Sequence, residues 1–385
     1  MKDPTPRKKP NILLRLITFL LSLAILLGAV ALVVYRDRLN LDALVRWVQY
    51  RTLETNETGQ AEPFFYGGGT AVDLGCLDGA QLFSSQNGVR LFTNLGDELV
   101  NDVFTLSNPV QNTSGRLGVV YDMGGQELRA YDSRGQVFSL TLEEGYGLLS
   151  ARPNDAGWLA VTAQQSGWRG VVTVYNSEFF PQMSLRYSSS FAIDAVLSPD
   201  SGTVAAVTMG QDGTSFESQL VLYHVGQEEP AATLSLGNTT VLDLAHSGSA
   251  VRVLGESSLL LAASDGSQVV SYNFSDRYLK GYDLGGDDFS LILLGRYRAG
   301  TASELLVIGD DGLLISRLDP DAQILDLSAA GRYFAVLTSQ RLDIYTKDLT
   351  LYASLEDIQG AQSIQLRDDG SVLLADGESA WLYLP

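Results

Sequence analysis

A short strand–turn–strand unit recurs along most of this chain. The segments Val241–Gly248 and Ile324–Gly331 match position for position, and Ser363–Gly370 is a third copy. A fourth copy, Ala195–Gly202, has a turn that is one residue longer. In each copy an apolar stretch leads into a turn that ends in glycine, and a second apolar stretch follows. Glycine accepts the positive φ angles of tight turns at little cost, so each unit predicts a β-hairpin.

The spacing of the turn glycines gives the size of the repeat. These glycines are Gly79, Gly115, Gly157, Gly202, Gly248, Gly331 and Gly370. Successive glycines lie 36 to 46 residues apart, except for one gap of 83 residues that corresponds to two units. We place the missing unit at Asp288–Pro320, with strands at Ser290–Leu294, Leu305–Ile308 and Leu313–Leu318. About 40 residues with four short strands is typical of a propeller blade, whereas β-sandwiches would need units of about 100 residues.

Eight units predict an all-β fold, a β-propeller of four-stranded blades. The last unit, residues 362–385, supplies only three strands, so a strand from the start of the domain must complete it if the ring is to close. If Phe64–Tyr66 is the closing strand, the propeller has eight blades, which is the arrangement we favour. If Ala71–Leu74 closes the ring instead, seven blades are favoured.

The stretch Leu197–Val207, which reads LSPDSGTVAAV, and its copies resemble the WD40-like and quinoprotein-like β-propeller superfamily. The resemblance covers Ala71–Pro385, and its Ser-Pro-Asp-Gly type of motif is common among bacterial propellers without being specific to one function. The chain departs from true WD40 proteins because it has no Gly-His or Trp-Asp dipeptide. Its whole layout resembles uncharacterised, single-pass, membrane-anchored propeller proteins of Gram-positive bacteria. That resemblance implies a fold and a compartment but no reaction.

Leu16–Tyr35 is a run of twenty uncharged residues, long enough to span a bilayer as a helix. Five basic residues precede the run, namely Lys2, Arg7, Lys8, Lys9 and Arg15. Because basic flanks stay in the cytoplasm, the N-terminus is expected inside and the rest of the chain outside. A cleaved signal peptide is the alternative, since Ala29-Val30-Ala31 has the form of a cleavage site. The run continues beyond that site, which favours an uncleaved anchor in the lipid bilayer.

The domain plan follows from this segment. We expect a cytoplasmic basic tail at 1–11, a transmembrane helix at 12–35, a juxtamembrane segment and linker at 36–62, and an extracytoplasmic propeller at 63–385. Within the third part, Leu39–Arg51 is either an amphipathic helix near the headgroups or an extension of the anchor. Thr52–Glu62 is polar and aperiodic, which indicates a linker. The glycines 67–69 lack the lysine of a phosphate loop and indicate a flexible lead into the first strand.

Charge and cysteine content restrict the class of partner and the compartment. Beyond Arg38 the chain has 19 basic and 43 acidic residues, a net charge of about −24, which disfavours binding to nucleic acid or anionic lipid. Cys76 is the only cysteine, so no disulfide can form within the chain. An exported animal domain of this size usually has several disulfides, so their absence favours a bacterial envelope. Cys76 itself is expected to be a small core residue.

The sequence contains no motif that indicates a catalytic, cofactor-binding or metal site. The only histidines are His224 and His246, and His246 occupies a position expected to be a solvated turn. Asp243 and Asp326 lie at equivalent repeat positions, which favours a structural role such as hydrogen bonding to neighbouring backbone. The acidic pairs Asp287-Asp288, Asp310-Asp311 and Asp368-Asp369 lie at turns, where Ca²⁺ could bind, although no EF-hand pattern supports this.

Two functions remain open. The first is a non-enzymatic binding or scaffold module that holds a protein or polymer of the cell envelope on one face of the propeller. The second is a surface polysaccharide hydrolase or lyase that uses Asp and Glu on propeller loops. Trp158, Trp168 and Tyr175 are candidates for an exposed aromatic patch, although at least two of them are expected in the blade core.

Overall fold

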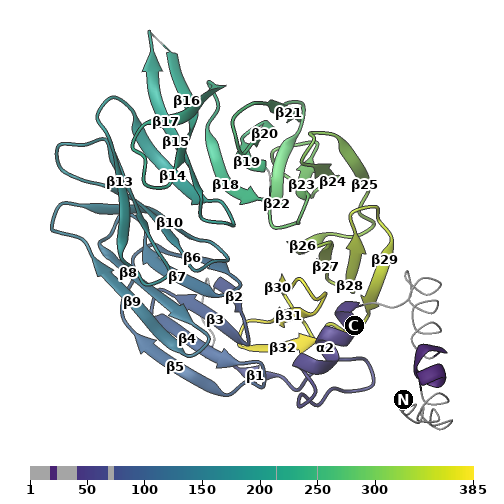
Figure 1. Cartoon of the computed structure of the whole chain (residues 1–385). Helices are drawn as coiled ribbons and strands as arrows, with labels where there is room; N and C mark the ends of the chain where they lie inside the picture. Colours follow the sequence, from purple (N-terminus) through teal and green to yellow (C-terminus); the bar gives the residue numbers. More distant parts are fainter. Residues whose placement is uncertain (1–17, 24–40, 68–72, 214, 249) are drawn as a thin grey trace, which may run out of the picture. The chain divides into compact units, whose positions relative to one another are not determined.

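The structure is a computed structural model that describes residues 18–23, 41–67, 73–213, 215–248 and 250–385. It divides into two compact units, Met1–Arg51 and Thr52–Pro385. The second unit is a ring of eight four-stranded antiparallel sheets (Figure 1). The predicted propeller fold is therefore confirmed, and the number of blades is eight.

Each of the first four blades is formed by four consecutive strands. Blade 1 contains β2 (Asp73–Leu77), β3 (Ala80–Ser85), β4 (Gly88–Thr93) and β5 (Glu98–Val103), and blade 2 contains β6 (Pro109–Ser114), β7 (Leu117–Asp122), β8 (Glu127–Asp132) and β9 (Gly135–Thr141). Blade 3 contains β10 (Gly147–Pro153), β11 (Leu159–Gln164), β12 (Gly170–Tyr175) and β13 (Pro181–Tyr187), and blade 4 contains β14 (Phe191–Leu197), β15 (Thr203–Asp212), β16 (Ser215–His224) and β17 (Pro230–Gly237). The long β15–β16 hairpin projects beyond the other blades (Figure 1).

Three further blades follow the same order, and the eighth differs. Blade 5 contains β18 (Val241–Ser247), β19 (Ala250–Gly255), β20 (Ser258–Ala263) and β21 (Val269–Asn273), and blade 6 contains β22 (Tyr278–Asp283), β23 (Phe289–Gly295), β24 (Glu304–Gly309) and β25 (Leu314–Leu318). Blade 7 contains β26 (Ile324–Ala330), β27 (Tyr333–Thr338), β28 (Leu342–Thr346) and β29 (Leu351–Leu355). Blade 8 contains β30 (Ser363–Leu366), β31 (Val372–Ala375) and β32 (Ser379–Tyr383), together with β1 (Phe64–Phe65) from the start of the unit.

The N-terminal strand closes the ring, as the eight-blade prediction requires. Phe64 pairs with Ala380 and Phe65 pairs with Ser379, so β1 is the outer strand of blade 8. The Phe64 ring also lies edge-on to Phe83 of blade 1, with 6.0 Å between ring centroids. This strand therefore joins the last blade to the first. The alternative closing segment, Ala71–Leu74, is wrong because β2, which begins at Asp73, belongs to blade 1.

The predicted linker is shorter than its polar sequence suggested. Within Thr52–Glu62, Gln60 forms a β-bridge with Tyr383, and the Ala61 N–H donates to the Leu382 carbonyl at 2.8 Å. The Gln60 side chain accepts a hydrogen bond from the buried Trp381 indole, Nε1 to Oε1 3.0 Å. Polar residues dock here because blade 8 offers unpaired backbone and an indole N–H beside the closing strand. The chain is thus fixed to the propeller from about Gly59 onward.

The core of the propeller lies between the blades. Each large cluster of buried apolar residues draws its members from two neighbouring blades, such as Val172 of blade 3 with Val204 of blade 4. Another cluster joins Leu337 of blade 7 to Val372 of blade 8. The first strands of successive blades also contact one another around the axis. One blade cannot bury its apolar faces alone, so the blades are stable only as a ring.

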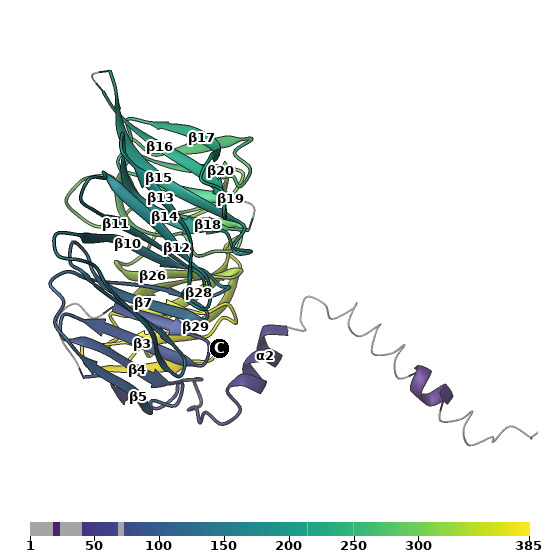
Figure 2. The same cartoon turned by 60° about the vertical axis from the view of Figure 1, so that its left-hand side comes forward.

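The two faces of the ring differ in the connections that they carry. We call the face that holds the turns between the first and second strands of each blade the turn face. The opposite face, which holds the loops between second and third strands and the connections from blade to blade, is the loop face. Gln60 pairs with Tyr383, which pairs with Val372 directly after the turn at Gly370. The N-terminal segment therefore reaches the propeller on the turn face. Figure 2 shows the ring turned by 60° from the view of Figure 1.

The sixth blade begins earlier than the sequence suggested. The missing unit was placed at Asp288–Pro320, but its first strand is β22, and a five-residue loop, residues 284–288, replaces the tight turn of the other blades. Without that turn the sequence repeat is interrupted. The three strands predicted for this unit correspond to β23, β24 and β25.

The N-terminal unit contains the helix α2 (Leu41–Gln49), which agrees with the helix expected within Leu39–Arg51. Trp47 is 69% exposed and Val48 is 57% exposed. The predicted span Leu16–Tyr35 lies mostly outside the described residues, of which only 18–23 fall within it, and those are helical. Among the described residues, no helix is long and apolar enough to cross a membrane.

Candidate binding surface

Hydrogen bonds link the turns of neighbouring blades on the turn face. The Asp78 N–H of blade 1 donates to the Gly115 carbonyl of blade 2, and the Ser114 hydroxyl of blade 2 donates to the Asn154 carbonyl of blade 3. The Asn154 amide in turn donates to the Ser198 carbonyl and the Ser201 hydroxyl of blade 4, both at 2.8 Å. These bonds explain why the turn sequence repeats, since each turn supplies partners for the next.

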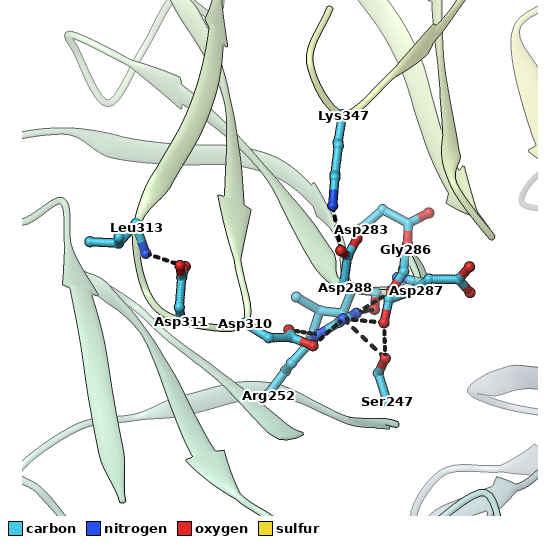
Figure 3. Close-up of polar contacts among 12 residues, drawn as sticks. Ser247, Arg252, Asp283, Gly286, Asp287, Asp288, Asp310, Asp311, Leu313 and Lys347 are labelled. Carbon is cyan, nitrogen blue, oxygen red and sulfur yellow. Dashed lines mark hydrogen bonds and ion pairs between the residues drawn. The ribbon is translucent and has the colours of Figure 1, made fainter. Parts of the chain in front are cut away.

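Arg252 performs the same task where blade 6 lacks the tight turn (Figure 3). Its side chain is fully buried on β19 and donates two bonds to Asp310, 2.7 and 3.0 Å long. The Nη1 atom of the Arg252 guanidinium donates to the carbonyls of Leu284 and Gly286, both at 2.6 Å. The replacement loop between β22 and β23 is therefore fixed to blade 5 by an arginine whose donors all have acceptors.

The acidic pairs at the turns belong mostly to this framework. Asp310 is bound by Arg252, and Asp288 forms an ion pair with Lys347. Asp311 accepts a hydrogen bond from the N–H of Leu313 at 3.0 Å. Among the residues that the structure describes, no group of three or more Asp, Glu, His or Cys side chains is arranged to hold a metal.

The first strands of blades 3 to 7 share a β-bulge near the loop face. The bulged residues are Leu149, Ile193, Leu242, Lys280 and Leu325, and the residues that follow them are Ser150, Asp194, Asp243, Gly281 and Asp326. The equivalence of Asp243 and Asp326 is confirmed, and Asp194 is a third member of the series. A bulge changes the direction in which nearby side chains point. The residues that follow the bulges therefore occupy equivalent positions around the propeller axis.

The carboxylates of this ring bind protein groups. Asp326 accepts the backbone N–H groups of Leu327 and Ile364, both at 2.8 Å, so it joins blade 7 to blade 8. Arg152 of blade 3 forms ion pairs with Asp194 at 2.8 Å and with Asp243 at 2.5 Å. The expected structural role of Asp243 and Asp326 is therefore confirmed, and Arg152 extends it across three blades.

Blade 6 places its axial carboxylate two residues later, at Asp283. This group accepts hydrogen bonds from the N–H groups of Gly285 at 2.6 Å and Ala329 at 2.9 Å. Burial raises the pKa of Asp283 to about 6, and the charges of Asp243 and Asp326 add to the increase, while the two hydrogen bonds oppose it. Asp283 therefore titrates well above an ordinary carboxyl group, although both of its oxygens bind backbone.

Several residues singled out in the sequence lie apart from one another. Trp158 packs partly buried between blades 3 and 4, and Tyr175 packs partly buried between blades 2 and 3. Trp168 lies in a loop and is 40% exposed, so the three do not form one exposed patch. His246 is in strand β18 rather than a turn, and burial lowers its pKa. Cys76 is in β2 but only half-buried, not in the core.

The loop face presents large apolar side chains to solvent. Leu242 and Leu325, the bulged residues of blades 5 and 7, are 44% and 42% exposed although they lie on innermost strands. Phe191, at the start of β14, is also exposed, and the Arg169 guanidinium lies 5.0 Å from its ring centroid. Exposed apolar side chains can contribute to an interaction surface, although the turn face also exposes some, such as Phe180 and Leu351.

Blade 6 adds positive charge to this face. Its loop between β23 and β24 has eight residues, 296–303, and begins with Arg296, Tyr297 and Arg298. Tyr297 is 75% exposed, and the Lys280 ammonium donates to the Arg298 carbonyl at 2.8 Å. Tyr278 pairs with Gly295 at the base of the loop and is 46% exposed. We call Tyr278, Lys280, Arg296, Tyr297 and Arg298 the blade 6 patch.

Comparison with known proteins identifies a family. Residues 69–351 match a family of unknown function, DUF5711. The chain belongs to this family. No curated protein matches the chain. Membership of DUF5711 therefore agrees with the propeller region without assigning it an activity.

Solved structures resemble this DUF5711 protein in fold alone. The computationally designed Ika8 protein has a TM-score of 0.60 at 13% identity, with 83% of this chain and 99% of that chain covered. The Dos1 propeller has a TM-score of 0.57 at 10% identity, with 84% and 94% covered. The C-terminal WD40 domain of Sif2 has a TM-score of 0.52 at 13% identity, with 85% and 96% covered. These values support the WD40-like propeller fold that the turn motif indicated.

The blade 6 patch was missed by the search of the sequence for motifs. A signal was present, because Arg277, Lys280, Arg296 and Arg298 fall within 22 residues of a strongly acidic chain. Their sequence is not a known motif, and only the pairing of β22 with β23 brings Lys280 beside the loop. Asp194 was missed because its unit has a longer turn: Asp194 lies eight residues before Gly202, whereas Asp243 lies five before Gly248.

Proposed function

We propose that this chain is a non-enzymatic binding module, tethered to the outer side of a bacterial membrane by Leu16–Tyr35, that holds an envelope partner on its loop face. The observation that carries the proposal is the exposure of apolar side chains on that face, including Leu242 and Leu325 on innermost strands. Burying such groups against a partner is favourable by about 25 cal/mol per Å² of apolar area. The axial carboxylates favour this function over polysaccharide cleavage, since protein donors occupy them.

The path of the chain supports the same arrangement. The N-terminal segment reaches the propeller on the turn face, where Gln60 pairs with Tyr383. Residues 60 and 61 thus lie on the face opposite to the loop face. The apolar run, its basic flank and the low cysteine content support a membrane of a Gram-positive bacterial envelope as the location.

Site-specific photocrosslinking in intact cells tests the binding surface. A photoreactive amino acid is introduced at Tyr297 on the loop face or, as a matched control, at Leu313 in a turn of the same blade on the turn face. These residues are 75% and 65% exposed, so they offer similar access. The proposal expects a discrete adduct from Tyr297 and none from Leu313. Equal adducts from both positions, or none from either, would contradict it.

Cysteine labelling tests the location separately. The variant Cys76→Ser removes the only thiol, and a single cysteine is then added at the exposed Asp97→Cys. Labelling of intact cells by a membrane-impermeant maleimide, with the protein in the membrane fraction, is the expected result. Labelling only after lysis would place the propeller inside the cell.

A further inference from the structure

Blade 6 differs from blades 5 and 7 at two positions of its first strand, the bulged residue and the residue that follows it. Blades 5 and 7 have leucine at the bulge and aspartate after it, as Leu242-Asp243 and Leu325-Asp326. Blade 6 has Lys280-Gly281. At the bulge a cation thus replaces an apolar side chain, while the carboxylate of blade 6 lies two residues later, at Asp283. The added cation makes the local potential at the bulge more positive.

The cations of the blade 6 patch are not used by the fold. Within the described part of the chain, Lys280, Arg296 and Arg298 have no ion pair, and Lys280 has only its bond to the Arg298 carbonyl. The acidic side chain that directly follows the loop, Glu304, is committed elsewhere, since it is buried and paired with Arg277 and Arg317. The patch therefore presents uncompensated positive charge in a protein whose other arginines are mostly paired.

The form of the patch suits an anion that is presented by a protein. Arginine binds carboxylates through two parallel hydrogen bonds, and arginine and tyrosine are among the residues enriched at the energetic centre of protein interfaces. Tyr278 and Tyr297 flank the cations and are exposed. A long polyanion would extend from the patch over a surface of net negative charge and be repelled there. A short run of carboxylates is repelled less.

We infer that the blade 6 patch binds an acidic segment of a protein partner, with Arg296 and Arg298 on its carboxylates and the two tyrosines against its backbone and apolar side chains. This inference rests on the proposed function, because it names the chemistry of the partner for the same face.

The test uses the full-length chain and an oligo-glutamate peptide as the probe, with a matched oligo-glutamine peptide as the control. Binding is measured by fluorescence anisotropy at two salt concentrations. We expect the glutamate peptide to bind, with affinity that falls as salt increases, and the double variant R296E/R298E to weaken binding by about tenfold or more. The matched variant R116E/R186E reverses two exposed arginines that also lack ion pairs among the described residues, and it should bind like the wild type.

Three outcomes would overturn the inference. One is equal weakening in both double variants, which would indicate attraction by net charge alone. Another is failure of the wild type to bind the glutamate peptide while it binds polyphosphate or vesicles of anionic phospholipid through the same arginines. The third is an adduct from Tyr297 in cells that is unchanged by R296E/R298E, which would leave the proposed function standing and remove this account of its partner. Loss of that adduct in R296E/R298E alone supports the inference.

Discussion

The turn face and the loop face of this propeller use their polar groups in opposite ways. On the turn face, Asn154 and Arg252 are buried and make hydrogen bonds to the next blade. On the loop face, Arg296 and Arg298 are exposed and lack ion pairs within the described residues. The comparison teaches that polar side chains buried between blades hold the ring together, whereas exposed polar side chains that bind no neighbouring blade are available to a partner.

The largest effect should come from Arg252→Met on the turn face. The variant leaves Asp310 as an uncompensated charge and removes donors from the carbonyls of Leu284 and Gly286. Breaking a buried pair on one side costs about 3–5 kcal/mol. Chemical denaturation followed by circular dichroism should show this loss, with Arg298→Met as the control that stays within about 0.5 kcal/mol of wild type. A similar loss of stability in both variants would contradict the difference between the two faces.

A smaller loss is expected from Asn154→Ala. Its side chain donates to Ser198 and Ser201 of the next blade and accepts the N–H of Trp158. Removal leaves the Trp158 N–H without its acceptor and takes one hydrogen bond from Ser201 and from the Ser198 carbonyl, which keeps the Ser201 N–H, at a cost of about 2–3 kcal/mol in the free energy of unfolding. Thermal denaturation checks this, and an unchanged transition would show that the turns are not coupled through Asn154.

Asp283, which lies near the propeller axis, should make the free energy of unfolding depend on pH. Its pKa is raised to about 6 in the folded protein, so the folded state holds this proton more tightly than the unfolded state does. The stability it contributes is therefore present below about pH 4 and is lost as pH rises through about 6. Relative to Asp283→Asn, the free energy of unfolding of the wild type should fall by about 2 kcal/mol from pH 4 to pH 7. A constant difference would contradict the raised pKa.

The smallest effect on stability is expected from Lys280→Leu, which restores the residue found in blades 5 and 7. Lys280 donates one exposed hydrogen bond, so the free energy of unfolding should change by less than about 0.5 kcal/mol. Binding of the oligo-glutamate peptide should weaken by about threefold, since one partly exposed cation is removed. The reciprocal variant Leu325→Lys, in blade 7, should not weaken it. If Lys280→Leu binds the oligo-glutamate peptide as tightly as the wild type does, Lys280 does not contribute to binding by the blade 6 patch.

The sequence predicts the propeller fold better than it predicts the blade 6 patch. Turn glycines such as Gly331, which has φ of +56° and whose added Cβ would lie 3.3 Å from Asp368, recur because most of these turns need a residue in the left-handed region; in blade 4 that residue is Ser201 rather than Gly202. The closing strand Phe64–Phe65 is predictable because an open blade leaves unpaired backbone. The blade 6 patch depends on the pairing of Tyr278 with Gly295, which no local pattern specifies.

The central claim is that blade 6, where the repeat is interrupted, forms the binding surface on the loop face. Hydrogen–deuterium exchange of the full-length chain, with and without the oligo-glutamate peptide, tests it most directly. Blade 7 is the internal reference because its first two strands have the same pairing and bulge. The account predicts slower exchange over residues 278–303 and unchanged exchange over residues 324–341. Equal protection of both segments, or protection of blade 7 alone, would contradict it.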